Sequence, residues 1–348
     1  MLANAPLLEK QATMSTEQTK MKALELRSHG LDFDLVMSEQ AMPEPSSNEL
    51  LVAIEYVALN HLDARMARDG FSQWDYPHIL GLDAVGTVVQ AGKGVFPKAG
   101  ARVLFNANLA QKGMLKEFAV VPNHAVSELP TGISPEVAVI LPNAGMAALL
   151  AIEKLKLTEG DSLAINSAQG AVAHFAIQYA KQKGAQVFAF AQKEHHKRLR
   201  KLGADFAFDC ESESVCDQIK REIGPEGFDC ILNTSGGDSF IEDLRHLRFC
   251  GRIACLNGFG HIPEELLFEK APNIGVVSIG GAWLANNLCA QQHLCFMGQK
   301  LLADVKSGQL KVPDIELIEF SAQAVKDTLS CLLTSSCQKR PVIKIEHV

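Results

Sequence analysis

The sequence predicts an α/β protein in which a β-rich domain precedes a doubly wound domain with a parallel sheet. From Met21 to about Pro142, short β-rich runs such as LLVAIEYVAL (50–59) and AVGTVVQAG (84–92) alternate with turns that contain Gly and Pro. This pattern is typical of an all-β unit with a partly rolled sheet. From Leu141 onward, strand and helix patterns alternate, which indicates a parallel sheet with helices on both faces.

The expected elements also set the limits of the domains. The β-rich part has further strands at 101–105 and 115–122, and the later part begins with a helix after Leu141. The later part has strands expected at 161–166, 185–191, 206–209, 228–234, 251–257 and 273–281. After Ala290 a helix leads to two short strand-like runs, DIELIEF and PVIKIEHV, which are too few to fold alone. We therefore expect a polar, mobile tail at 1–20, a first domain at 21–143 completed by 289–348, and a doubly wound domain at 144–288.

Composition excludes several classes of protein. The formal net charge of the 348 residues is −7, whereas a nucleic-acid-binding domain is expected to be basic. No apolar run reaches the roughly 20 residues that a membrane helix needs. The first 20 residues lack the basic start and long apolar stretch of a signal peptide. All nine cysteines lie between Cys210 and Cys337, and this odd number favours buried free thiols in a reducing, cytoplasmic compartment.

The strand expected at 161–166 runs directly into a turn of small residues and then a helix, which is the context of a dinucleotide-binding site. Small residues let a pyrophosphate approach the backbone, and the start of the helix offers unpaired N–H groups. Because the motif has a single glycine, an ordinary tight turn between a strand and a helix is the alternative. The candidate cofactor-binding residues of this turn are Ser167, Ala168, Gln169, Gly170, Ala171 and Val172.

The end of the next strand favours NADPH over NADH. An NAD site carries an acidic residue about 20 residues after the glycines, but here Phe190 and Ala191 end the strand. Basic and polar residues follow at once and suit a 2′-phosphate, although Glu194 adds one opposing charge. The alternative is a solvated helix face that happens to be basic. The remaining candidate cofactor-binding residues are Gln192, Lys193, His195, Arg198, Asn143 and Asn257.

Several runs together resemble the medium-chain dehydrogenase/reductase superfamily. They include VALNHLD (57–63), PHILGLDAVGTVV (77–89), AGKGV (91–95), LGAD (202–205) and GRI (251–253). These runs follow the family order and spacing over residues 21–345. The resemblance implies a GroES-like β domain and a Rossmann domain, with the active site in the cleft between them.

Departures from the family pattern point to its zinc-independent, quinone oxidoreductase-like branch. Zinc-dependent members carry ligands or a nearby acid where this chain has Asn60, Leu82, Asp83 and Asn143, and neither a leucine nor two amides suit zinc. The four-cysteine lobe of those enzymes falls between Phe105 and Gly113, where this chain has no cysteine. The branch usually has two glycines in the nucleotide turn, so a β-carbon at Ala171 is a departure that bears on cofactor affinity.

The resemblance implies a metal-free transfer of hydride from NADPH to a quinone or an enone. Asn60 is the first candidate to donate a hydrogen bond to the acceptor oxygen, and its alternative role is to brace the loop. Asp63 is expected to hold that loop by accepting backbone N–H bonds, and His61 is a candidate proton relay. Two alternatives stay open, a 2-enal or enoyl reductase and a non-catalytic nucleotide-binding protein. The expected last Rossmann strand, 273–281, favours a homodimer through an exposed sheet edge.

Overall fold

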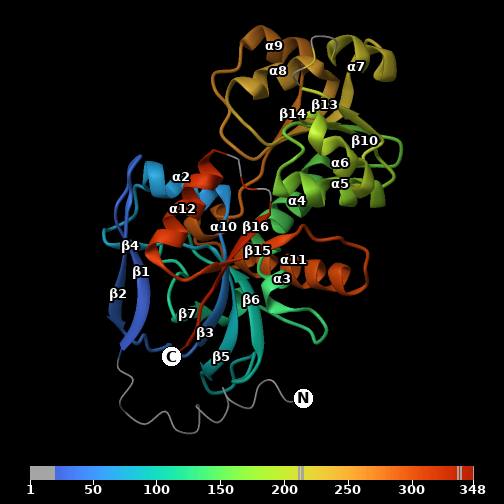
Figure 1. The fold of residues 1–348 in the computed structure, drawn as a ribbon. Coiled ribbons are helices and arrows are strands. Elements are labelled where there is room, and N and C mark those ends of the chain that lie inside the picture. The colour runs from blue at the N-terminus through green and yellow to red at the C-terminus, as the bar shows by residue number, and fades with distance from the viewer. Residues whose placement is uncertain (1–19, 211, 213–214, 335–336, 338, 348) are drawn as a thin grey trace. The chain divides into compact units, whose positions relative to one another are not determined.

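The computed structural model describes residues 20–210, 212, 215–334, 337 and 339–347. Its chain forms two compact units. The first comprises the described residues up to Asn143 together with Gly280–Ser307 and Pro313–Val348, and the second comprises Ala144–Ile279 and Gly308–Val312 (Figure 1). The tail expected at 1–20 lies outside the described residues except for Lys20, where the first strand begins.

The limits of the units differ from the expected domains in two segments. The chain rejoins the first unit at Gly280 instead of residue 289, because the backbone there packs against Leu109: a β-carbon on Gly280 would lie 2.3 Å from Leu109 Cδ2. Gly308–Val312 groups with the second unit, since the Lys311 carbonyl accepts from His174 Nε2 at 2.8 Å and the Lys311 N–H donates to Gln178 at 2.8 Å.

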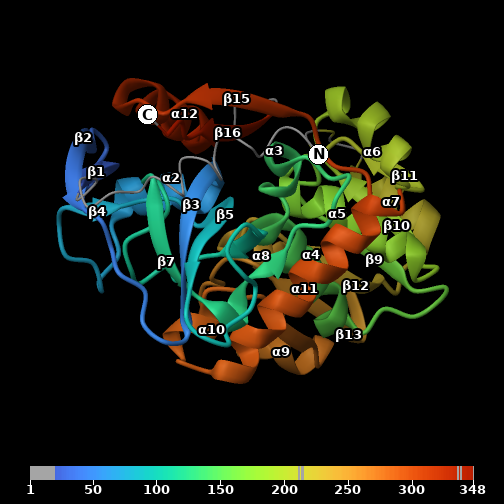
Figure 2. The same cartoon turned by 90° about the horizontal axis from the view of Figure 1, so that it is seen from below.

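The first unit contains a three-stranded sheet in the order β2-β1-β4 and a seven-stranded sheet in the order β15-β16-β3-β5-β6-β8, with β7 paired to β3. Seven of the ten residues of β3 are buried, which suits its central position between β5, β7 and β16 (Figure 2). The strands are β1 (Lys20–Ser28), β2 (Asp34–Ala41), β3 (Glu49–Ala58), β4 (His78–Ile79), β5 (Asp83–Ala91), β6 (Arg102–Asn106), β7 (Phe118–Pro122), β8 (Ser127–Glu128), β15 (Ile315–Glu319) and β16 (Arg340–Lys344).

The first unit also contains helices, so the expectation of an all-β domain over 21–142 is wrong in detail. The clearest case is α2 (His61–Asp69), which begins after the N-cap residue Asn60 and ends at Gly70 with φ 74°. Its buried face carries Ala64, Met66 and Ala67, and a helix of this length is too short to give a strong periodic pattern. The other helices are α3 (Pro135–Ala138), α10 (Gly281–Leu284), α11 (Leu288–Lys306), α12 (Ala322–Leu333) and the 3₁₀ turn η1 (Asn123–Ala125).

The second unit is a doubly wound domain, as the alternating pattern predicts. Its six-stranded sheet has the order β11-β10-β9-β12-β13-β14, and every strand pair in it is parallel. The chain order reverses at β9, and ligands bind at such a switch point beyond the carboxyl ends of the strands. The strands are β9 (Ser162–Ile165), β10 (Gln186–Phe190), β11 (Phe206–Phe208), β12 (Phe228–Asn233), β13 (Leu247–Cys255) and β14 (Asn273–Val276).

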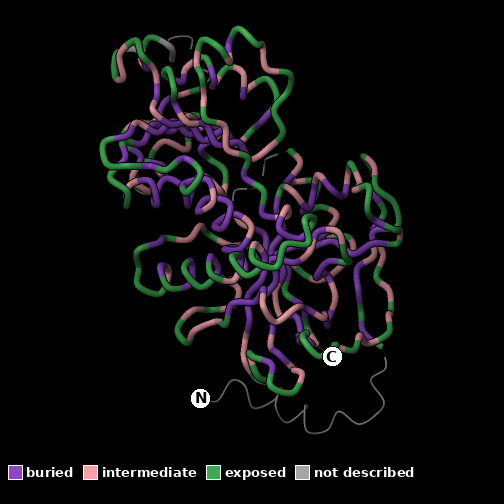
Figure 3. The backbone as a smooth tube through the Cα atoms, turned by 180° about the vertical axis from the view of Figure 1, so that it is seen from behind, coloured by how far each residue is buried: buried purple, intermediate pink, exposed green. Residues whose placement is uncertain are grey.

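Helices flank this sheet, and α4 (Pro142–Leu155) spans the boundary between the units. The remaining helices are α5 (Ala171–Gln182), α6 (His196–Leu202), α7 (Val215–Ile223), α8 (Asp238–His246), α9 (Glu264–Lys270) and the 3₁₀ turn η2 (Lys193–His195). Each unit has its own buried apolar cluster, built around Leu24, Ile54 and Leu59 in the first and Phe188, Phe228 and Phe240 in the second. Figure 3 shows both central sheets as largely buried backbone.

The cysteines depart from the expectation of buried free thiols. Cys331 and Cys337 form a disulfide bond. Of the free cysteines, Cys230 and Cys255 are buried, whereas Cys210, Cys250 and Cys289 are exposed. No helix in the described part of the chain combines the length and apolar character needed to cross a membrane.

Candidate functional site

The turn after β9 has the geometry of a phosphate-binding turn. Ser167 adopts the left-handed region with φ 44°, and the buried Ala168 donates its N–H to the Phe190 carbonyl at 2.9 Å. Gly170 precedes the first residue of α5, and the first bond of the helix runs from the His174 N–H to the Gly170 carbonyl. The N–H groups of Ala171 and Val172 therefore belong to the unpaired first turn, where an anion is favoured.

Space in front of this turn is open. A β-carbon built on Gly170 would meet only the Ser167 carbonyl oxygen, at 3.4 Å, among the described atoms. The turn can thus accept a phosphate group against its backbone, and these residues fit the pyrophosphate of a dinucleotide. The side chain of Ser167 is held by a 2.7 Å hydrogen bond to the Ser235 hydroxyl, which joins this turn to the segment after β12.

A polar network holds the ends of β9 and β12 together. Asn166 accepts from the Thr234 N–H at 2.7 Å and donates to Asp243 at 2.7 Å, and Asn233 donates to the same Asp243 oxygen at 2.7 Å. Burial raises the pKa of Asp243 to about 6. Asn257 donates to the Thr234 carbonyl at 2.6 Å, so this predicted cofactor-binding residue braces the crevice. Sequence reasoning missed Asp243, because its partners are distant in the chain.

The basic segment after β10 lies against the same turn. Arg198, in α6, donates from Nη2 to the Gln169 carbonyl at 2.7 Å, and partial burial lowers the pKa of its guanidinium. Lys193 and Gln192 are exposed at the start of η2, and His195 Nε2 lies 3.5 Å from Glu194. The structure therefore brings Arg198 directly to the turn and leaves Lys193 exposed to solvent in the neighbouring 3₁₀ turn.

In the first unit, Asn60 and Asp63 form the capping box at the start of α2. The Asn60 N–H donates to Asp63 Oδ2 at 2.8 Å, and both side chains are buried. Asp63 thus accepts a backbone N–H bond, in the bracing role expected for it. Burial raises the pKa of this carboxyl to about 6.

Asp83 joins this capping box to the strands beside it. Its carboxylate accepts from Asn60 Nδ2 at 3.0 Å, from Asn106 Nδ2 at 2.7 Å and from the Asn143 backbone N–H at 3.0 Å. Asp83 and Asn106 are direct cross-strand neighbours in β5 and β6, which explains why their side chains meet. The side chain of Asp83 is completely buried, and this burial raises its pKa to about 7.

Arg340 is the cation of this network. Its Nη2 donates to Asn60 Oδ1 at 2.5 Å, while its buried Nε has no hydrogen-bond partner among the described residues. Its guanidinium interacts favourably with the charges of Asp83 and Asp63, although burial itself lowers the arginine pKa. Sequence reasoning missed Arg340, which lies 280 residues from its partner.

His61, by contrast, is exposed in the first turn of α2, and desolvation together with Arg65 lowers its pKa.

Comparison with known proteins identifies the family. The alcohol dehydrogenase GroES-like domain matches residues 46–131, and the zinc-binding dehydrogenase domain matches residues 171–292. The chain is 32% identical to the trans-enoyl reductase tazE of Aspergillus terreus over 212 residues, which cover 56% of this chain and 70% of that protein. The chain belongs to the medium-chain dehydrogenase/reductase superfamily. It is therefore an oxidoreductase of this superfamily.

Two further similar proteins cover almost the whole chain. The putative quinone oxidoreductase YhfP of Bacillus subtilis is 23% identical over 339 residues, which cover 94% of this chain and 99% of that protein. A mycobacterial structure complexed with NADPH superposes with a TM-score of 0.81 at 20% identity, covering 93% of this chain and 100% of that chain. The likeness to the mycobacterial structure shows that the two chains share a fold.

The positions that bind zinc in some medium-chain dehydrogenases do not suit zinc here. Leu82 is a buried residue of the apolar core, and Asn60 directs its amide nitrogen, not its oxygen, to Asp83. Asn143 contributes its backbone N–H to Asp83, so this predicted cofactor-binding residue also braces the network. Over the described residues, no group of three or more His, Cys, Asp or Glu side chains is placed to hold a metal ion. The side chains around these positions instead form a network of amides and carboxylates that hydrogen-bond to one another.

Proposed function

We propose that this protein is an NADPH-dependent reductase of conjugated carbonyl compounds, either quinones or enones, that acts without a metal. The observation that carries the proposal is the end of β10. It stops at Phe190 with no acidic residue to accept from a ribose hydroxyl, and the basic segment that follows is tied by Arg198 to the nucleotide turn. This arrangement favours a 2′-phosphate over a 2′-hydroxyl.

The second unit would hold the cofactor through its turn and its basic segment. The turn at Ser167–Val172 and the start of α5 suit the pyrophosphate, and Lys193, His195 and Arg198 suit the 2′-phosphate. NADPH, when bound, supplies the hydride. The presence of NADPH in the mycobacterial relative supports this choice of cofactor.

The network in the first unit would orient Asn60. Its Oδ1 accepts from Arg340, and one Nδ2 hydrogen is directed to Asp83. The second Nδ2 hydrogen, which in this structure interacts with the Asp63 carboxylate, is the donor that we assign to the acceptor oxygen, where negative charge develops during reduction. In this role Asn60 is both the bracing amide and the donor, because the bonds to Asp83 and Arg340 fix the direction of the remaining N–H.

Two substrate classes follow from the relatives. Quinone reduction is supported by the likeness to YhfP over nearly the full chain, and enoyl reduction by the higher identity to tazE. Both reactions deliver hydride to a conjugated system and leave charge on an oxygen. We place the protein in the cytoplasm, on the composition of its sequence.

The direct experiment is a panel of simple quinones and 2-enones assayed with NADPH and with NADH. We expect turnover with at least one class, faster with NADPH. We also expect Asn60→Ala to lower kcat by roughly 10²-fold, the effect of removing one oxyanion donor. Tight NADPH binding with no turnover on any acceptor would identify a non-catalytic nucleotide-binding protein and would refute the proposal.

A further inference from the structure

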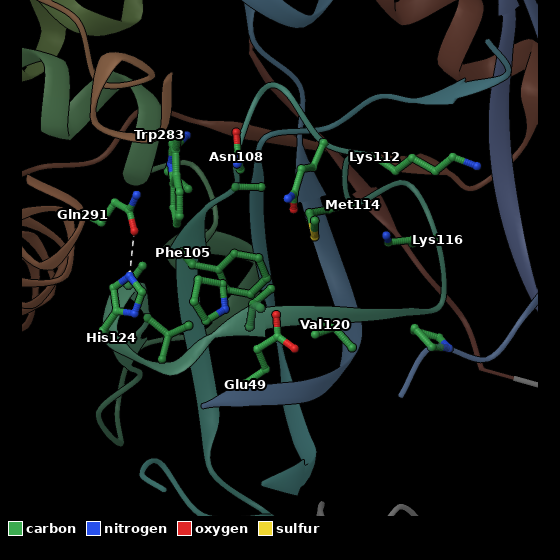
Figure 4. A pocket seen from close by; sticks show the side chains of 18 of the residues that line it. Glu49, Phe105, Asn108, Lys112, Met114, Lys116, Val120, His124, Trp283 and Gln291 are labelled. Atoms are coloured by element: carbon green, nitrogen blue, oxygen red, sulfur yellow. Dashed lines mark hydrogen bonds between the residues drawn. The ribbon is translucent and has the colours of Figure 1, made fainter. Parts of the chain in front are cut away.

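A cavity of about 360 Å³ lies within the first unit (Figure 4). Its walls come from β6, β7, the segment 107–116 and the start of α11. The volume is within the range of small-molecule sites. Asn106 belongs both to this wall and to the polar network around Asp83.

The apolar part of the cavity is formed by Phe105, Met114 and Val120, which Figure 4 shows near its centre and floor. Trp283, His124 and Gln291 form one side, and Lys116 faces them from the other. Such a mixture of apolar walls and a few polar groups at the edges is typical of ligand sites.

Two donors of this cavity have no acceptor. The ammonium of the half-buried Lys116 makes no hydrogen bond or ion pair in the described part of the chain, and burial, reinforced by Lys112, lowers its pKa to about 8. The indole Nε1 of Trp283 is buried and also lacks a hydrogen-bond partner among the described residues. A buried donor without an acceptor, such as this indole N–H, is uncommon and destabilising.

Some acceptors of the lining are already engaged. His124 Nε2 and Gln291 Oε1 pair with each other at 2.8 Å, and Glu49 accepts from the Ser46 N–H at 2.9 Å. Beside these acceptors, the lining offers the Lys116 ammonium and the Trp283 indole N–H as donors to a ligand, and apolar walls to the rest of it.

We propose that this cavity is a second small-molecule site that binds a compact carboxylate with a flat apolar body. The carboxylate would accept from Lys116, and the apolar body would lie against Phe105, Met114 and Val120. The indole N–H of Trp283 would donate to a further acceptor atom of the ligand. The cavity shares Asn106 with the network around Asp83, and its occupancy can be measured without the proposed reaction.

The test is calorimetric titration of the full chain, without nucleotide, with 2-naphthoate and with the neutral 2-naphthalenemethanol. We expect saturable binding of the carboxylate, at least tenfold tighter than that of the alcohol. Lys116→Met should weaken the carboxylate about tenfold or more, as the loss of a charge-assisted hydrogen bond implies, and should leave the alcohol unchanged. Lys116→Arg should retain most of the affinity.

Lys93→Met is the matched control, because Lys93 is exposed in the turn after β5 and does not line the cavity. It should change the affinity by less than twofold. Thermal melts of each variant establish that it is folded. Absence of saturable binding, equal affinity for the carboxylate and the alcohol, or equal losses in Lys93→Met and Lys116→Met would each overturn the proposal.

Discussion

Replacement of Arg340 by Met tests whether the polar network of the first unit depends on its cation. The substitution removes the donor to Asn60 Oδ1 and the positive charge beside Asp83 and Asp63. Breaking a buried pair by removing one partner costs about 3–5 kcal/mol. Because Arg340 retains partial exposure, solvent screening reduces this figure, and we expect a loss of about 2–4 kcal/mol in the free energy of unfolding at pH 8.

The loss should depend on pH in a defined direction. Burial raises the folded pKa of Asp83 to about 7 and of Asp63 to about 6, above the ordinary value of 3.8. A carboxyl with a raised folded pKa favours folding at low pH, and that contribution is lost as the pH rises through the folded pKa. Without Arg340 the charged carboxylates are less compensated, so the penalty should be large at pH 8 and smaller at pH 5.

The assay is urea unfolding followed by tryptophan fluorescence. Both tryptophans of the chain, Trp74 and Trp283, lie in the first unit, so the signal reports on the unit that contains the network. Arg68→Met is the control, because Arg68 forms an exposed ion pair with Asp69 at 2.7 Å and should cost under about 1 kcal/mol. An Arg340→Met penalty equal to that of the control, or equal at pH 5 and pH 8, would refute the reasoning.

Three further predictions follow from particular residues. Lys116→Met should raise the free energy of unfolding by about 1 kcal/mol at pH 7, because burial lowers the pKa of Lys116 to about 8. This gain should shrink between pH 8 and pH 10.5, where the folded wild type loses its proton before the unfolded chain does; a constant gain in melts across this range would contradict the assignment. Purified protein should contain no stoichiometric zinc, since Leu82 and Asn60 do not suit it, and one chelation-resistant zinc per chain by elemental analysis would show otherwise. We also propose a homodimer through β14, an edge strand on which Val276 is 51% exposed; a monomer mass by light scattering at micromolar concentration would argue against it.

The fold could be predicted from the sequence because its strongest signals are local. The alternation of strands and helices predicted the parallel sheet, and the small-residue turn and the basic segment after β10 lie where the pattern placed them. The helix α2 was missed because a short helix between strands gives few periodic positions. The same locality explains why Asp63 could be assigned its bracing role, since its partner is three residues away.

The rest of the candidate site depends on pairs that are distant in the chain. Arg340 reaches Asn60, Asp243 reaches Asn166, and the side chains around Lys116 come from five separate segments. The spacing of residues in a single sequence gives no sign of such pairs, because the pairs form only in the folded chain. From the sequence, Asn60 could either donate to the acceptor or brace the loop. Its bonds to Asp83 and Arg340 show the bracing contacts, and the donor role stays a proposal.

The preference for NADPH is tested most directly by measuring the dissociation constants of NADPH and NADH for the wild type and for charge variants. We expect NADPH to bind more tightly than NADH by about tenfold or more, which is the contribution of one well-placed charge-assisted contact. Lys193→Glu should remove most of this preference and should leave NADH affinity nearly constant. The control is Lys201→Glu, since Lys201 is exposed at the far end of α6. Its effect on NADPH affinity should be smaller than that of Lys193→Glu. Equal affinity of the wild type for the two cofactors would contradict the central claim, and the basic segment would then be an ordinary solvated surface.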